Sequence, residues 1–218
     1  MKRLLAALVL SVSTALMAGV GAQRPALAAS ADTPVAEIFA TNNTAIITDP
    51  NDPRLDTHLV GFARRVDDII RDRGSDPERS TLLNGVFWDS TRQQVTYERS
   101  REFDVERIDA AQLHADAAVI RDRFHQESVL TFELLPRTSP RAQAIEVEVP
   151  GIDVRRLHDG LVADPTLRDQ LGGGSVTLAG RLILVAGRAD LALVQQFVAD
   201  LGGRWAAATV RFGAEEFV

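Results

Sequence analysis

The side chains with the clearest chemical potential lie on one predicted strand, over residues 95–105. With regular alternation, Tyr97, Arg99 and Arg101 share a face with three apolar residues, and the opposite face is wholly polar. We therefore expect the first face to be buried and the second to meet water. Because a buried guanidinium group needs an anionic partner, Arg99 and Arg101 are candidates for binding an anionic ligand.

Structural alternatives compete with this anion site. An internal salt bridge, a hairpin that extends beyond the sheet, or a bulge near Ser100 would each account for the two arginines without a ligand. His125 is a further candidate, because it lies beside Gln126 and Glu127 in the segment 120–130. No catalytic residue is identified. The predicted ligand-binding residues are Tyr97, Arg99, Arg101 and His125.

The histidines do not show the spacing of a metal site. His114 and His125 are eleven residues apart on one predicted helix, which separates them by about 16 Å along its axis. His58 and His158 each flank the apolar stripe of a different helix. The chain has no cysteine, so thiolate ligands and disulfides are excluded. We predict no metal and no cofactor.

Other catalytic motifs are missing from the sequence. Gly172-Gly173-Gly174-Ser175 follows a predicted helix and precedes a strand, whereas phosphate-binding loops run from strand to helix. No Gly-x-Ser-x-Gly motif occurs, which leaves an α/β-hydrolase triad without support. The only lysine is Lys2, so the predicted mature chain has no lysine for a Schiff base or a phosphate loop.

The first 28 residues have the pattern of a secretory signal peptide. Met1-Lys2-Arg3 is basic, Leu4 to Val20 is largely apolar, and Ala26-Leu27-Ala28 is a typical cleavage site. We therefore expect a signal peptide over 1–28, a secreted or extracytoplasmic protein, and no membrane attachment after cleavage.

Charge and composition narrow the class of partner. The 190 residues after the signal contain 21 basic and 30 acidic residues, a net charge of −9. Such an acidic chain is a poor candidate for binding nucleic acid or an anionic membrane. With 45% hydrophobic and 25% charged residues, the composition is that of a globular protein with one large or two small domains.

The elements that must position these residues repeat in the order β-α-β-β-α-β. We predict an α+β fold of two tandem ferredoxin-like units with antiparallel sheets, an internal duplication over 29–135 and 144–218. A Pro-containing linker, 136–143, separates them. In the first unit a helix is expected from the Asp52-Pro53 cap onward. The strand at 182–185 is apolar on both faces, so its sheet must be covered on both sides, by the other unit or by a second copy of the chain.

One segment carries a family resemblance. The run Ile120-Arg121-Asp122-Arg123-Phe124-His125-Gln126-Glu127-Ser128-Val129-Leu130 resembles an uncharacterised bacterial exported domain-of-unknown-function family. In that family the second helix enters the last strand through Arg-Phe-x-Gln-Glu-Ser-Val-Leu. The resemblance extends to element order over about 35–135. It implies export and ferredoxin-like topology, and it implies no activity.

Three functions fit these observations. The leading hypothesis is a secreted, soluble, non-enzymatic interaction or ligand-binding module. Its partner would be an unknown protein or a small anionic ligand, and the sheet faces could also pair two copies as a homodimer. The alternative is an enzyme of the α+β-barrel type, in which two such sheets enclose a small organic molecule. A protease-inhibitor or pro-segment-like module is the third. A concave apolar pocket between the sheets would favour the enzyme, and a flat sheet face the binding module.

Overall fold

The computed structural model describes residues 35–218. The predicted signal peptide, 1–28, lies outside the described residues. Within 35–218, no helix has both the length and the apolar character that crossing a membrane would require.

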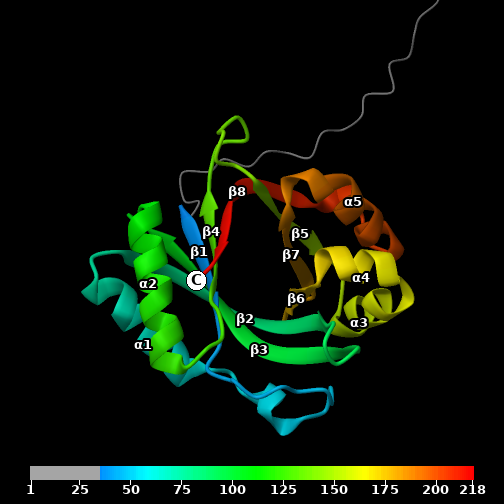
Figure 1. The fold of residues 1–218 in the computed structure, drawn as a ribbon, viewed down its shortest axis with the longest axis horizontal. Coiled ribbons are helices and arrows are strands. Elements are labelled where there is room, and N and C mark those ends of the chain that lie inside the picture. The colour runs from blue at the N-terminus through cyan, green and yellow to red at the C-terminus, as the bar shows by residue number, and fades with distance from the viewer. Residues whose placement is uncertain (1–34) are drawn as a thin grey trace, which may run out of the picture.

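Eight antiparallel strands close into a barrel in the order β1-β3-β2-β6-β7-β5-β8-β4 (Figure 1). Every neighbouring pair in this circle is antiparallel. The strands are β1 (Ala36–Ala40), β2 (Asp76–Asp89), β3 (Gln94–Glu106), β4 (Leu130–Leu134), β5 (Ala144–Pro150), β6 (Gly173–Thr177), β7 (Arg181–Gly187) and β8 (Thr209–Phe217).

The prediction of two tandem ferredoxin-like units with separate antiparallel sheets is wrong. Strands β1 to β4 are neighbours in the barrel, and so are strands β5 to β8. However, β2 also pairs with β6, and β4 also pairs with β8. The strands therefore form one closed sheet. Closure pairs the N–H and C=O groups that two open sheets would leave exposed along their edges.

Glycines stand at both places where the two halves join. A Cβ atom on Gly173 of β6 would collide with the backbone oxygen of Val86 on β2, and one on Gly213 of β8 with that of Glu133 on β4. The missing side chains let the strands approach closely enough to pair. The glycine run at 172–174 therefore includes the start of a barrel strand in addition to its role in ending a helix.

Helices cover the outside of the barrel on two sides. α1 and α2 lie over one side, and α3, α4 and α5 over the other (Figure 1). The helices are α1 (Val60–Asp72), α2 (Ala110–Phe124), α3 (Val154–Ala163), α4 (Pro165–Leu171) and α5 (Leu191–Asp200), with short 3-10 helices η1 (Pro53–Asp56), η2 (Arg188–Asp190) and η3 (Trp205–Ala207). Asp109, Asp153 and Asp164 begin α2, α3 and α4, because each side chain accepts a hydrogen bond from a backbone N–H of the first turn.

The apolar cores lie between these helices and the outer face of the barrel. Phe62 of α1 packs with Ile38 and Phe103 in one core, and Phe197 of α5 with Ile145 in the other. The apolar faces of the strands therefore point outward, toward the helices, and their alternate side chains point into the barrel.

The polar face of β3 was expected to meet water, and this expectation is wrong. Ser100, Glu102 and Asp104 are each 4% exposed, because they point into the closed barrel. The predicted first helix also differs: Asp52 caps only η1, and α1 begins at Val60. The intervening residues Thr57 and His58 run along the outside of β3, as their contacts below show.

Candidate acidic centre and cavity inside the barrel

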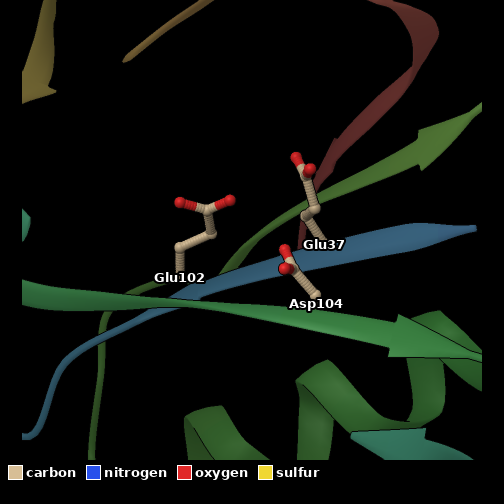
Figure 2. A group of neighbouring side chains, drawn as sticks. All are labelled: Glu37, Glu102 and Asp104. Atoms are coloured by element: carbon tan, nitrogen blue, oxygen red, sulfur yellow. The ribbon is translucent and has the colours of Figure 1, made fainter. Parts of the chain in front are cut away.

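Five carboxylates and one arginine meet inside the barrel. The acidic cluster, as we call it, consists of Glu37 on β1, Glu102 and Asp104 on β3, and Glu146 and Glu148 on β5. Register places Glu37 opposite Asp104, so both point to the same side of the sheet. Figure 2 shows Glu37, Glu102 and Asp104 rising from the face of β1 and β3 that is turned away from the helices. Glu37 and Glu146 are fully buried.

Arg211 of β8 connects three members of the cluster. Its NH1 lies 2.8 Å from Glu37 Oε1, and its NH2 lies 2.7 Å from Glu146 Oε1 and 2.7 Å from Glu148 Oε1. Burial lowers the pKa of Arg211, but the charges of these three carboxylates outweigh it and raise that pKa overall. Arg211 is therefore a permanent positive charge at the centre of the barrel.

Two further arginines reach the cluster from its edge. Arg79 Nε lies 2.9 Å from Asp104 Oδ2, and Arg181 NH1 lies 2.6 Å from Glu148 Oε2. Both side chains are more than half exposed, at 64% and 53%, so their ion pairs contribute little to stability. The cluster therefore holds five carboxyl groups against three guanidinium groups.

Several oxygens of the cluster have no partner among residues 35–218. Glu37 Oε2, Asp104 Oδ1 and Glu146 Oε2 are buried without a hydrogen bond, and no described basic side chain forms an ion pair with Glu102. Burial raises the pKa of Glu102 to about 8, with contributions from the charges of Glu146 and Asp104. Burial likewise raises the pKa of Glu37 and of Glu146. The free oxygens and raised pKa values show that the arginines do not fully compensate these acids.

A cavity of about 740 Å³ opens at one mouth of the barrel. This volume is in the range of sites for small organic molecules. Register links the cavity to the acidic cluster, because Phe39 faces Glu102 and Val185 faces Glu146 across neighbouring strands. Apolar side chains from five strands line its inner wall: Phe39, Phe87, Leu130, Ile183, Val185 and Phe217.

A few polar groups interrupt this apolar wall. Glu98, Ser100 and Ser175 line the cavity from inside the barrel. Burial raises the pKa of Glu98, and a hydrogen bond from Ser100 offsets part of the rise. At the rim, Gln126 Oε1 accepts a hydrogen bond from the backbone N–H of Thr41 at 2.9 Å, which ties the end of β1 to the segment after α2.

The predicted site residues Arg99 and Arg101 lie on the outer face of β3. Arg99 is 5% exposed; its Nε donates to the Thr57 carbonyl at 2.9 Å, and its NH1 contacts Asn84 Oδ1. Arg101 donates from Nε to Ser80 Oγ at 2.8 Å and from NH1 to the backbone carbonyl of residue 58 at 2.8 Å. These hydrogen-bond acceptors of the two guanidinium groups are therefore neutral oxygens. Burial lowers the pKa of each arginine, and the charge of Asp56 near Arg99 and of Asp67 near Arg101 offsets part of this effect. The register of β3 with β2 is regular at this point.

The four predicted site residues do not converge. The ring of Tyr97 stacks on His158, with centroids 6.0 Å apart, and both Tyr97 and His125 border the cavity mouth. His125 ends α2 in a left-handed conformation, at φ 55°, and its side chain is exposed. Arg99 and Arg101 are turned away from the cavity, toward η1 and the start of α1.

The acidic cluster was not predicted from the sequence, although one signal for it was present. On β5, Glu146 and Glu148 alternate with Ile145, Val147 and Val149, which is the pattern of a strand with one polar and one apolar face. A second strand, β3, also has an acidic face, with Glu98, Glu102 and Asp104 on it. A barrel with a polar interior and helices around its outside produces this pattern, in which a strand has one acidic face and one face covered by helices.

Comparisons with known proteins do not assign the chain to a family. No family model matches the chain, and no curated protein matches it. Among solved structures, the chain is similar to a candidate monooxygenase from Lactobacillus acidophilus, with 11% identity, 86% of this chain and 96% of the other covered, and a TM-score of 0.26. At this TM-score the likeness does not bear on function, and the resemblance of residues 120–130 to an exported family stays a prediction.

Proposed function

We propose that the protein binds a small, largely apolar organic molecule inside its barrel. The observation that carries this proposal is the cavity of about 740 Å³. Aromatic and aliphatic side chains from five strands line it together with Glu98, Ser100 and Ser175, and its rim is largely polar. Sites of this composition take up small molecules by burying most of their surface. The acidic cluster next to the cavity favours a neutral or cationic ligand over an anionic one.

Filling the cavity is expected to abolish binding of a neutral fluorescent probe, N-phenyl-1-naphthylamine. Ser175 lines the cavity, so the ring of a Ser175→Phe variant occupies space that the probe needs. We expect its affinity for the probe to fall at least about tenfold, which corresponds to about 1.4 kcal/mol. Fluorescence titration measures this change.

Leu178→Phe is the matched control. Leu178 is 61% exposed and lies between β6 and β7, outside the barrel cavity, so the same ring added there leaves probe binding unchanged. A wild type that does not enhance probe fluorescence, or a Ser175→Phe variant that binds as the wild type does, contradicts the proposal.

A second candidate function is acid–base catalysis on such a molecule, and Glu98 is the observation that favours it. A carboxyl group with a raised pKa inside an apolar cavity is a typical general base or acid. The neutral aromatic compound 5-nitrobenzisoxazole opens its ring when a base removes its C–H proton. We expect the protein to accelerate this reaction, with a rate that rises with pH as Glu98 ionises.

Glu98→Gln is expected to lower that rate about 10²-fold or more while probe binding is retained. Glu78→Gln, on an exposed residue of β2, is the control and keeps the wild-type rate. An equal rate in the Glu98→Gln variant would exclude Glu98 as the base, without affecting the proposal of ligand binding.

A further inference from the structure

Three carboxylates of the acidic cluster have the spacing of ligands to a single cation. One oxygen from each of Glu37, Glu102 and Asp104 lies within 4.8 Å of the others, and Figure 2 shows the three groups gathered on one side of β1 and β3. Oxygens bound to one Ca²⁺ lie about 2.3–2.6 Å from the ion, and hence up to about 5 Å from each other. The three oxygens therefore fit around one ion without rearrangement of the strands.

A fourth carboxylate supplies an independent indication of a missing positive charge. Glu146 comes from a different strand, is fully buried, and its Oε2 has no hydrogen-bond partner. It contacts the same guanidinium group as Glu37. A buried carboxylate oxygen without a donor is costly, and two oxygens of the three-carboxylate group, Glu37 Oε2 and Asp104 Oδ1, lack a donor as well.

Arg211 leaves one oxygen of Glu37 and one oxygen of Glu146 without a partner. It faces Oε1 of Glu37 and Oε1 of Glu146, while Oε2 of both residues is free. The cluster as a whole holds two more carboxyl groups than guanidinium groups. When all five carboxyl groups are ionised, one divalent cation would complete the charge balance of the cluster.

We propose that Glu37, Glu102 and Asp104 bind one hard divalent cation inside the barrel. The donor set contains only carboxylate oxygens, which suits Ca²⁺, Mn²⁺ or Mg²⁺ rather than a metal that prefers nitrogen or sulfur. The cavity adjoins the cluster and provides the path by which an ion enters. This proposal goes beyond the proposed function, because the cation site and the cavity wall use different residues.

The test is calorimetric titration of the full chain, freed of metal by chelator and dialysis, with MnCl₂ and separately with CaCl₂. We expect the wild type to bind one ion per chain and its melting temperature to rise with the ion. Glu102→Gln keeps the side-chain shape but removes a charged ligand, and it is expected to weaken binding at least about tenfold. Glu78→Gln removes an exposed carboxylate of β2 and is expected to bind as the wild type does.

Asp104→Asn serves as a second ligand variant if Glu102→Gln does not fold, with circular dichroism reporting the fold of each. A folded wild type that shows neither binding heat nor a melting shift with either ion overturns the proposal. Unchanged affinity in both folded ligand variants overturns it too. Ser175→Phe separates the two proposals, because it is expected to lose the fluorescent probe and to keep the cation.

Discussion

An Arg211→Met variant is expected to be less stable than the wild type by about 3–5 kcal/mol near neutral pH. The wild-type guanidinium is 15% exposed and faces oxygens of Glu37, Glu146 and Glu148 at 2.7–2.8 Å. Methionine fills much of the same space but offers no charge. Its introduction leaves three carboxylates together in a closed interior, where each disfavours ionisation of the others.

The loss is expected to shrink as the pH falls, because protonated carboxyl groups no longer need the arginine. Urea denaturation of the metal-free proteins at several pH values measures both the size and the pH dependence of the effect. Arg181→Met is the matched control: Arg181 pairs with Glu148 but is 53% exposed, so its loss is expected to cost less than about 1 kcal/mol. Equal stability of the two variants would show that the Arg211 pairs do not hold the barrel interior together.

Alternation along β3 correctly predicted which side chains share a face, but not what each face meets. Tyr97, Arg99 and Arg101 do lie on one side of the strand, and Glu102 and Asp104 on the other. Period-two alternation separates two faces, and it is natural to assign the polar one to water. In a closed barrel both faces are covered, so an acidic face can be as buried as an apolar one.

Closure itself depends on contacts that local patterns do not contain. The pairing of β2 with β6 joins Gly85 to Ser175, and that of β4 with β8 joins Phe132 to Glu215. Each pair brings together residues more than eighty positions apart. The same long-range register assembles the acidic cluster, since Glu37 meets Asp104 across β1 and β3, and Glu146 meets Arg211 across β5 and β8. Alternation within one strand indicates an acidic face, but it does not indicate which strands bring such faces together.

The two predicted arginines illustrate a further limit of sequence reasoning. The sequence analysis expected an anionic partner for Arg99 and Arg101, because a buried charge needs compensation. The structure gives them carbonyl and side-chain oxygens instead, from Thr57, Ser80 and Asn84. Ser80 and Asn84 come from the neighbouring strand β2. The Thr57 carbonyl is available because the chain leaves η1 and does not enter α1 until Val60, a detail that the Asp52-Pro53 cap did not reveal.

The stability of the metal-free protein is expected to fall as the pH rises from about 4.5 to about 8. Burial and neighbouring acids raise the pKa of Glu102 from its ordinary value of 4.5 to about 8. Between these values the folded chain holds a proton on Glu102 that the unfolded chain has released. Unfolding therefore releases that proton, and raising the pH favours the unfolded state. The pKa values of Glu37 and Glu146 are raised as well and act in the same direction.

Glu102→Gln is expected to remove much of this dependence. The acids that face Glu102 are Asp104 on its own strand, Glu37 on β1, and Glu146 and Glu148 on β5, and Arg211 on β8 faces it as well. An uncharged amide does not suffer the repulsion of the four acids. We expect the variant to match the wild type below about pH 4.5 and to exceed its free energy of unfolding by about 2–4 kcal/mol above about pH 8. Urea denaturation in the presence of chelator measures the difference, and Glu78→Gln should follow the wild-type curve. A variant whose stability parallels the wild type at every pH would show that Glu102 ionises in the folded barrel as freely as it does in water.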